Sequence, residues 1–251
     1  MNASPPRPEP VTVRSAGLVA AELRKLKRSL VVPLSLAVPG LVLLFAFLAK
    51  FADATASANF LIALAGIWSY AMLPLGIVAL TVVLAQLEHG PRGWDPLLAL
   101  PGVRQRIFLI KLGAAFVTMA IWHAILWVGG VALAFLFAAT DPAFATAPEQ
   151  AGVFAHILAR MTLASLLMLV VQYGVALYFR SFVPPLLIGV GGIFLSVAAT
   201  ASRQGAYLPW LLATNQLASS SARADATLAF GLGGGIVAAL ILQWLMARRE
   251  W

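Results

Sequence analysis

Long apolar runs separated by short charged segments make up most of the chain. A helix of about 20 apolar residues crosses roughly 30 Å of hydrocarbon. Six uncharged runs of about that length cover residues 31–49, 59–87, 112–138, 161–179, 182–199 and 228–246. The pattern therefore predicts an all-α membrane protein with six transmembrane helices.

The boundary between the fourth and fifth runs is short. Only Arg180 and Ser181 separate two apolar stretches there. Pro184 and Pro185 follow directly, and proline disfavours helical backbone in the residue before it. We therefore expect a tight turn at this point and not one continuous helix.

Lys and Arg residues collect on one side of the predicted membrane. If the N-terminus is cytoplasmic, the segments on that side hold about three times as many Lys and Arg residues as the outer segments. The outer segments then hold Lys50, Arg160, Arg203 and Arg223. Because cytoplasmic loops are enriched in Lys and Arg, both termini are predicted to be cytoplasmic.

The N-terminal region divides into a tail and a helix. Residues 1–14 contain Pro5, Pro6, Pro8 and Pro10 and are predicted to be a disordered, proline-rich tail. Residues 15–251 are predicted to form a single six-span domain.

Residues 15–30 are predicted to form an amphipathic helix at the membrane interface. Val19, Leu23, Leu26 and Leu30 share one helical stripe. The basic residues mostly lie off that stripe, where they can face lipid phosphates. These membrane-interface residues are Arg24, Lys25, Lys27 and Arg28. The alternative is an ordinary positive flank before a first span.

Composition agrees with a bilayer environment. Hydrophobic residues make up 61% of the chain and charged residues 10%, whereas a soluble domain has about a quarter charged residues. A net charge of +8 would suggest nucleic-acid binding in a soluble protein, but here it fits cytoplasmic loops beside anionic lipid. We expect no nucleic-acid partner. The chain has no cysteine, which excludes disulfides, thiol catalysis and cysteine metal sites.

The segment between the second and third spans has the pattern of a short helix. Gly90, Pro91 and Gly93 break the preceding helix. Asp95 is then an N-cap residue and Pro96 a first helical residue. The helix that follows is apolar, so its side chains are unfavourably exposed to water unless another molecule covers them. Lipid headgroups, with Trp94 as an interfacial anchor, and a partner protein both remain open.

These features resemble the permease subunits of ABC type-2 exporters, in particular the lantibiotic and bacitracin immunity permeases. The similarity lies in residues 22–29, in residues 88–111 and in the six-span layout. It implies that the short cytoplasmic helix is a coupling helix that docks on an ABC ATPase subunit. The residues expected to make this contact are Glu88, Arg92, Trp94, Asp95, Leu97, Leu98 and Leu100.

The resemblance implies that the chain is a transport subunit. It also implies that the chain is a multi-pass protein of the bacterial inner membrane. The chain contains no G-x-x-x-x-G-K-[ST] motif, so ATP and Mg²⁺ are expected on the partner ATPase, and no cofactor on this chain. A second permease copy or a related permease is also expected. The substrate would be amphipathic or hydrophobic, such as an antimicrobial peptide or a lipid-like compound. The alternative is a polytopic membrane enzyme, or a secondary transporter, without an ATPase partner.

Trp122 and His123 lie within the third span and are candidate substrate-path residues. The alternative for His123 is a hydrogen bond to a neighbouring helix. Lys111 and Arg160 lie near predicted span ends, from which long cationic side chains reach the interface. The three histidines are scattered and predict no metal site.

Glycines and aromatic residues mark the last part of the chain. Clusters in the fifth and sixth spans predict close helix packing, either within the subunit, which we favour, or at a dimer seam. Their members are Gly189, Gly191, Gly192, Gly231, Gly233, Gly234 and Gly235. Residues 207–212, within the outer segment 200–227, have the pattern of a re-entrant or interfacial piece. It either caps a translocation path or serves as an aromatic anchor.

Overall fold

The computed structural model describes residues 15–51, 59–89 and 103–248, and this part of the chain contains helices and turns but no strand. The predicted all-α class is thereby confirmed for the described residues. The α-helices are α1 (Ser15–Lys27), α2 (Val31–Phe51), α3 (Phe60–Ile67), α4 (Leu73–His89), α6 (Val103–Thr140), α7 (Ala151–Ala164), α8 (Leu166–Tyr178), α9 (Val183–Ala199) and α10 (Ser221–Arg248). The π-helix η1 (Trp68–Met72) joins α3 to α4. The predicted tail, residues 1–14, lies outside the described residues.

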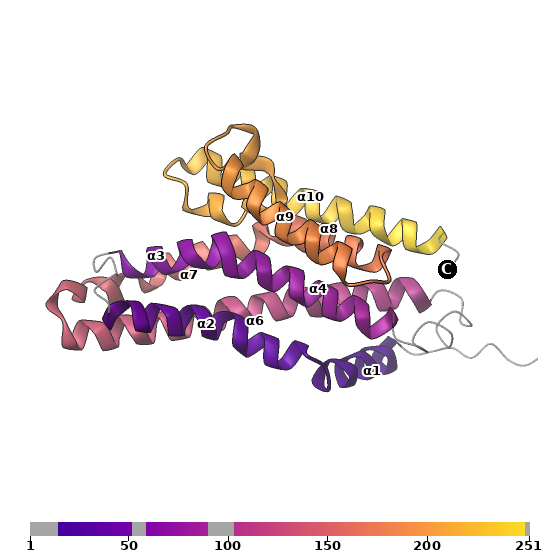
Figure 1. Cartoon of the computed structure of the whole chain (residues 1–251), viewed down its shortest axis with the longest axis horizontal. Helices are drawn as coiled ribbons and strands as arrows, with labels where there is room; N and C mark the ends of the chain where they lie inside the picture. The colour runs from indigo at the N-terminus through magenta and orange to yellow at the C-terminus, as the bar shows by residue number, and fades with distance from the viewer. Residues whose placement is uncertain (1–14, 52–58, 90–102, 249–251) are drawn as a thin grey trace, which may run out of the picture.

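Short 3₁₀ helices complete the described part of the chain. They are η2 (Pro142–Phe144), η3 (Ala147–Gln150), η4 (Gln204–Tyr207), η5 (Pro209–Leu211) and η6 (Thr214–Leu217). The first two join α6 to α7, and the other three lie between α9 and α10 (Figure 1).

Five helical segments in the described part are long and apolar enough to cross a membrane, so the chain is a multi-pass membrane protein. They are Val31–Lys50, Phe60–Leu87, Gln105–Thr140, Pro142–Tyr178 and Ser221–Met246. The remaining predicted span, residues 182–199, corresponds to α9, which has only 17 residues. At 1.5 Å per residue its length is about 26 Å, a little less than the hydrocarbon thickness of about 30 Å.

The helical segment of the fourth predicted span begins before residue 161. Arg160 marks the predicted boundary because it is charged, but it lies inside α7. Its guanidinium is 2.6 Å from Oδ1 of Asp225, so the charge is paired within the protein and does not require the helix to end. The turn at Ser165 separates α7 from α8.

The predicted separation of the fourth and fifth spans is present. Helix α8 ends at Tyr178, and α9 begins at Val183 with proline in its first turn. The amide of Gln172 then donates to the carbonyl oxygen of Pro185 at 2.8 Å, so the start of α9 is tied to α8.

Glycine lets α10 pack closely on α7 and α8. A Cβ atom at Gly231 would lie 2.2 Å from the carbonyl oxygen of Ala164, and one at Gly235 would lie 2.7 Å from Cγ of Leu166. A Cβ atom at Gly233 would meet nothing within 4 Å. The expected packing within the subunit is therefore confirmed at Gly231 and Gly235.

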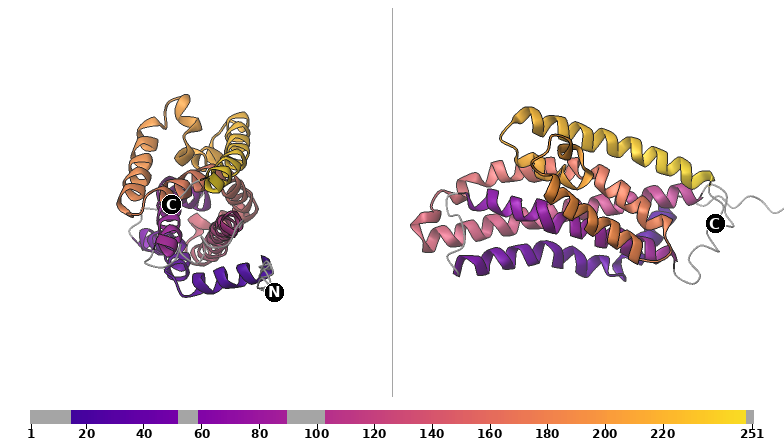
Figure 2. Two further views of the ribbon diagram at one scale, coloured as in Figure 1. Left: turned by 90° about the vertical axis from the view of Figure 1, so that its right-hand side faces the viewer. Right: turned by 45° about the horizontal axis from the view of Figure 1, so that its top comes forward.

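The described ends of the chain lie at one end of the bundle. Helix α1 and the last turns of α10 are both found there (Figures 1 and 2). We call this the α1 end, and the opposite end, which carries η2 and η3, the far end. In the left-hand view of Figure 2, α1 is seen lengthwise while the bundle helices are seen nearly end-on. Helix α1 therefore runs crosswise to the bundle helices, along the edge of the bundle at this end.

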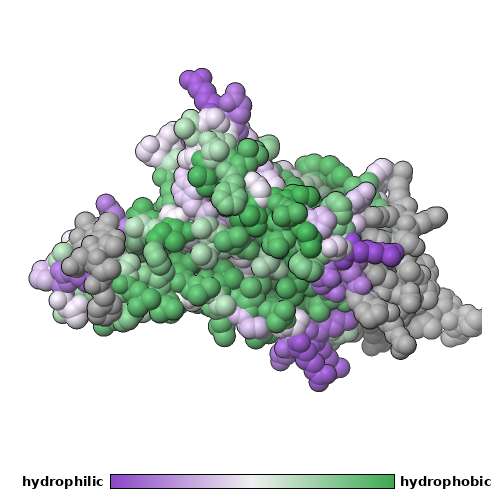
Figure 3. Space-filling view, in the orientation of Figure 1, coloured by the Kyte–Doolittle hydropathy of each residue, from purple (hydrophilic) through white to green (hydrophobic). Residues whose placement is uncertain are grey.

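Apolar side chains cover the middle of the molecule. Figure 3 shows hydrophilic residues at the two ends and on the segment between α9 and α10, with a broad apolar surface between them. Many large apolar residues of α2, α6, α9 and α10 are exposed there, such as Phe45, Phe135, Phe194 and Leu240. Such a surface is stable against lipid tails.

Candidate functional site

The residues predicted to dock an ATPase lie in the loop between α4 and α6. The structure describes neither the side chain of Glu88 nor residues 90–102, so Arg92, Trp94, Asp95, Leu97, Leu98 and Leu100 lie outside the described residues. It does place the helices that hold the loop, because α4 ends and α6 begins at the α1 end (Figure 1).

The four predicted membrane-interface residues are exposed. Arg24, Lys25 and Lys27 belong to α1, and Arg28 follows it in a turn. The buried side of α1 is formed by Glu22 and Leu26.

Glu22 joins α1 to α6 through a buried ion pair. Its Oε2 atom lies 2.8 Å from Nζ of Lys111, and its Oε1 atom accepts a hydrogen bond from Nζ of Lys25 at 2.8 Å. The side chains of Glu22 and Lys111 are 4% and 2% exposed. The ammonium group of Lys111 is therefore buried against a carboxylate of α1 and is not exposed at the protein surface, and its position relative to the membrane interface stays a prediction.

The electrostatics of Glu22 follow from these contacts. Burial by itself raises the pKa of the carboxyl, but hydrogen bonds from Lys111 and Lys25 and their positive charges outweigh it, so the pKa lies below its ordinary value. Glu22 is therefore ionised at neutral pH, as an ion pair requires.

The candidate substrate-path residues lie in the core of the bundle. Trp122 is fully buried and His123 nearly so. Nδ1 of His123 lies 2.9 Å from the carbonyl oxygen of Met119 and 3.1 Å from the hydroxyl of Thr162 on α7. The contact with Thr162 is the helix-to-helix hydrogen bond of the alternative interpretation. A role of either residue in a substrate path stays a prediction.

These two residues pack beside the π-helix η1. Trp68 of η1 lies edge-on to Trp122, with ring centroids 6.5 Å apart, and edge-on to His123 at 5.4 Å. Trp68 and Ser69 are buried, whereas Tyr70, the next residue of η1, is 38% exposed. The π-helix therefore has one side in the aromatic core and another at the surface.

The chain between α9 and α10 folds back against η1. The hydroxyl of Thr214 in η6 donates to the carbonyl oxygen of Ser69 at 3.3 Å. The neighbouring Asn215 and Gln216 are also buried. The segment predicted to be re-entrant or interfacial was residues 207–212, and the hydrogen bond to η1 is made slightly later, by Thr214 of η6. Its place in a membrane stays a prediction. We call residues 204–217, which return to η1 in the folded chain, the re-entrant segment.

Polar contacts hold this re-entrant segment in place. Nε of Arg160 donates to Oε1 of Gln216 at 3.0 Å, and the amide of Gln216 donates to the hydroxyl of Thr227 at 3.2 Å. The amide of Asn215 donates to the carbonyl oxygens of Ala206 and Leu211, both at 2.9 Å. Side chains from α7, η6 and α10 therefore form one network.

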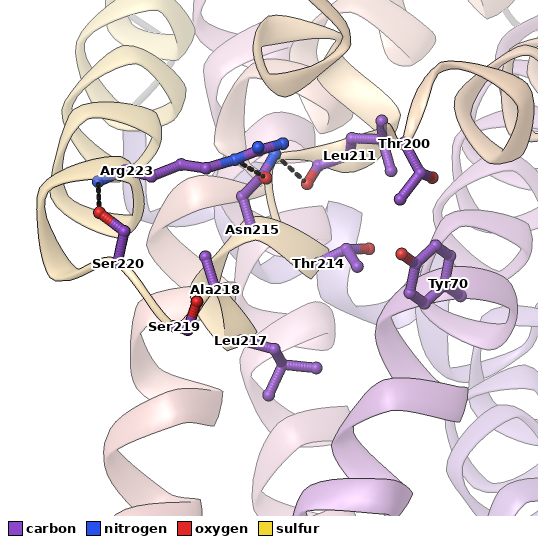
Figure 4. A pocket seen from close by; sticks show the side chains of 10 residues that line it. All are labelled: Tyr70, Thr200, Leu211, Thr214, Asn215, Leu217, Ala218, Ser219, Ser220 and Arg223. Carbon is purple, nitrogen blue, oxygen red and sulfur yellow. Dashed lines mark hydrogen bonds between the residues drawn. The ribbon is translucent and has the colours of Figure 1, made fainter. Parts of the chain in front are cut away.

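A pocket of about 410 Å³ lies between η1, the end of α9 and the start of α10 (Figure 4). Tyr70 and Thr200 lie on one side of it, and Ser219, Ser220 and Arg223 on the other. Nε of Arg223 donates to Oδ1 of Asn215 at 2.9 Å. Within the described ranges, no group of three or more His, Cys, Asp or Glu residues that could hold a metal ion is present.

Sequence reasoning missed this pocket and the Glu22–Lys111 pair. Asn215 and Gln216 are adjacent amides near an apolar stretch, and Glu22 is the single acidic residue of α1. Both features were available as signals. Neither feature identifies its partners. Lys111 and Arg160 lie far away in the sequence, and Asn215 contacts Arg223 only because the chain turns between η6 and α10.

Comparison with known proteins identifies the family. The sequence profile described as "ABC-2 family transporter protein" matches residues 18–196, which is more than two thirds of the chain. Searches of curated proteins and of solved structures give no match. The matched region runs from α1 through the loop between α4 and α6 into α9. The chain therefore belongs to the ABC-2 family of transporter proteins, as a membrane permease of an ABC transporter.

Proposed function

We propose that this chain is the membrane-spanning half of an ATP-driven exporter in the bacterial cytoplasmic membrane. It works with a separate ABC ATPase and with a second copy of itself or a related permease. The observation that carries the proposal is the family match over residues 18–196. Such permeases generally work with an ATPase subunit, and this chain has no phosphate-binding loop of its own.

The ATPase would dock on the loop of residues 90–102. The two helices that flank this loop enter the core of the bundle. Near the start of α6, Ile107 and Phe108 are buried, and the ring of Phe108 stacks on Tyr173 of α8 with centroids 5.7 Å apart. A movement of the loop would therefore be passed to α6 and on to α8.

Helix α1 would follow the same movement. Lys111 lies on the first turns of α6 and is joined to Glu22 of α1. The exposed basic residues of α1 would rest on anionic lipid headgroups, and its exposed Val19 and Leu23 on acyl chains. The ion pair would thus couple an interfacial helix to the docking loop.

The six-span topology with both termini cytoplasmic is part of this proposal. Helix α9 would make the fifth crossing, in addition to the five long apolar segments, and its short length would be completed by the re-entrant segment. The exported substrate would be amphipathic or hydrophobic, as the resemblance to the permeases of ABC type-2 exporters implies. An antimicrobial peptide has this character.

The test is co-purification of an ATPase with the tagged chain. We expect an ATPase encoded in a neighbouring reading frame to be retained by the wild-type chain and lost when Leu97→Asp is combined with Leu98→Asp. Charged residues on an apolar docking helix would leave carboxylates without partners at the interface.

The matched control is Val153→Asp. Val153 is 57% exposed on α7 near the far end, so it also places a carboxylate on an exposed apolar position. This variant should retain the ATPase. If the Leu97 and Leu98 double variant retained it equally well, residues 90–102 would not be the docking site.

A further inference from the structure

We propose that the pocket beside η1 binds the anionic headgroup of an amphipathic molecule, with the guanidinium of Arg223 as its counter-ion. The headgroup would be a phosphate or a carboxylate. Where the ligand is the exported compound, the inference rests on the proposed function and narrows its substrate class from amphipathic to anionic amphipathic.

The charges around the pocket favour an anion. Among the described residues, no carboxylate lies within 4.0 Å of Arg223, and its side-chain contact is with the neutral amide oxygen of Asn215. The nearby acidic residue Asp225 is paired with Arg160 at 2.6 Å. Arg223 therefore brings to the pocket a positive charge that no acidic residue of the described ranges neutralises.

Hydrogen-bond donors complete the site. In the described part of the chain, the hydroxyls of Tyr70 and Ser219 have no partner, and both residues line the pocket. The Nε atom of Arg223 is used by Asn215, which leaves the terminal nitrogens of the guanidinium for a ligand. An anionic group accepts strong hydrogen bonds from such donors.

The arrangement of Arg223 is held by the protein. Asn215 is buried, both hydrogens of its amide go to backbone carbonyls, and its oxygen accepts from Arg223. Its orientation is thus determined by the backbone of the re-entrant segment. The guanidinium is held in place before a ligand arrives, which lowers the entropy cost of binding.

The surroundings of the pocket suit an apolar tail. Val197 of α9 lies about one helical turn before Thr200 and is 57% exposed. Residues three apart in a helix share a face. Apolar surface on α9 therefore lies next to the polar pocket, as an amphipathic ligand requires.

The helix geometry at η1 supports a binding role. Single π-turns inside α-helices occur often at functional sites. Here the π-turn carries Tyr70 into the pocket while Ser69 receives the hydrogen bond from Thr214. One local distortion thus positions a ligand donor and holds the re-entrant segment.

The test measures binding to the purified full-length chain by native mass spectrometry in a non-ionic detergent. The probes are dioctanoyl phosphatidic acid, dodecyl phosphate, inorganic phosphate and, as the zwitterionic control with the same tails, dioctanoyl phosphatidylcholine. We expect saturable binding of dioctanoyl phosphatidic acid or dodecyl phosphate. The probe that binds more tightly shows whether the headgroup belongs to a two-chain membrane lipid or to a single-chain amphiphile.

Variants locate the site. Arg223→Gln should weaken binding of the anionic probe about tenfold, because a charge-assisted hydrogen bond is lost. Arg203→Gln is the matched control: it removes the same charge from an exposed residue of the same segment that does not line the pocket. It should change binding by less than about twofold.

A second variant keeps the charge and fills the pocket. Ser219 is exposed and lies outside the helices, so Ser219→Trp can fold normally while its indole occupies the pocket. It should also weaken binding about tenfold. Equal binding of phosphatidylcholine, equally tight binding of inorganic phosphate, or equal losses in Arg223→Gln and Arg203→Gln would each overturn the proposal.

The measurement needs no ATPase. Binding that depends on Arg223 would stand even if no ATPase co-purified with the chain. Conversely, a co-purifying ATPase together with absent binding would remove this inference and leave the proposed function intact.

Discussion

Glu22 and Lys111 form a buried ion pair that joins the helix at the start of the described chain to the first turns of α6. Their charged atoms are 2.8 Å apart, and both side chains are almost fully excluded from solvent. Isolated charges in such a place are costly, so each residue requires the other.

Removing one partner of this pair should destabilise the protein. We expect Lys111→Met or Glu22→Gln to lower the free energy of unfolding by about 3–5 kcal/mol, because one buried charge is left alone. The double variant should be closer to wild type than either single variant. The measurement is thermal unfolding in detergent, arranged as a double-mutant cycle.

Lys25→Met is the control for that experiment. Lys25 also contacts Glu22, but its side chain is 42% exposed, so solvent screens the interaction. We expect a loss of at most about 1 kcal/mol. An effect as large as that of Lys111→Met would show that the pair with Lys111 is not the dominant contact.

The stability contributed by Glu22 should depend on pH. The pKa of Glu22 is lower in the folded protein than its ordinary value of 4.5. The contribution is therefore fully present above about pH 4.5 and is lost as the pH falls through the folded-state pKa. The difference in melting temperature between wild type and Glu22→Gln should be largest near pH 7 and shrink below about pH 4.5. A constant difference between pH 7 and pH 3 would contradict the ionised pair.

Gly231 should not tolerate alanine. A Cβ atom there would lie 2.2 Å from the backbone oxygen of Ala164, which cannot move without shifting α7. We expect Gly231→Ala to destabilise the protein by about 1–3 kcal/mol. Thermal unfolding of the purified variant measures this.

Gly233→Ala is the matched control in the same helix. No heavy atom lies within 4 Å of the position of its Cβ atom, and alanine is the better helix former. It should leave the stability unchanged or raise it by up to about 1 kcal/mol. Equal losses in the two variants would argue against close packing of α10 on α7.

Arg160 should stabilise the re-entrant segment. Arg160→Met leaves Oε1 of Gln216 without its donor, and Gln216 is only 6% exposed. We expect faster hydrogen exchange in residues 204–217, corresponding to a loss of about 1–3 kcal/mol in local stability.

Asp225→Asn separates this contact from the ion pair. The side chain of Asp225 is 66% exposed, so its pair with Arg160 should contribute less than about 1 kcal/mol. Exchange in residues 204–217 should then stay close to wild type. If Asp225→Asn had the larger effect, the charge and not the Gln216 contact would hold the segment.

Hydropathy alone predicted the helical class and the solvent of this protein, because a run of about 20 apolar residues has few stable alternatives to a membrane helix. The two prolines Pro184 and Pro185 predicted the break between α8 and α9, because proline restricts the local backbone. The close packing of Gly231 and Gly235 followed from their spacing.

The partners of Glu22, Arg160 and Asn215 could not be predicted in this way. The contacts of Glu22 with Lys111 and of Arg160 with Gln216 join positions far apart in the sequence, and local periodicity carries no information about which helices become neighbours. Asn215 contacts nearby residues, but across turns whose course the hydropathy pattern does not specify. The charge of Arg160 was therefore interpreted as the end of a span. In the folded chain the helix continues through Arg160, because Asp225 and Gln216 bind its guanidinium. The pocket at Tyr70 and Arg223 exists only because the re-entrant segment returns to the π-helix, and that return depends on packing and not on composition.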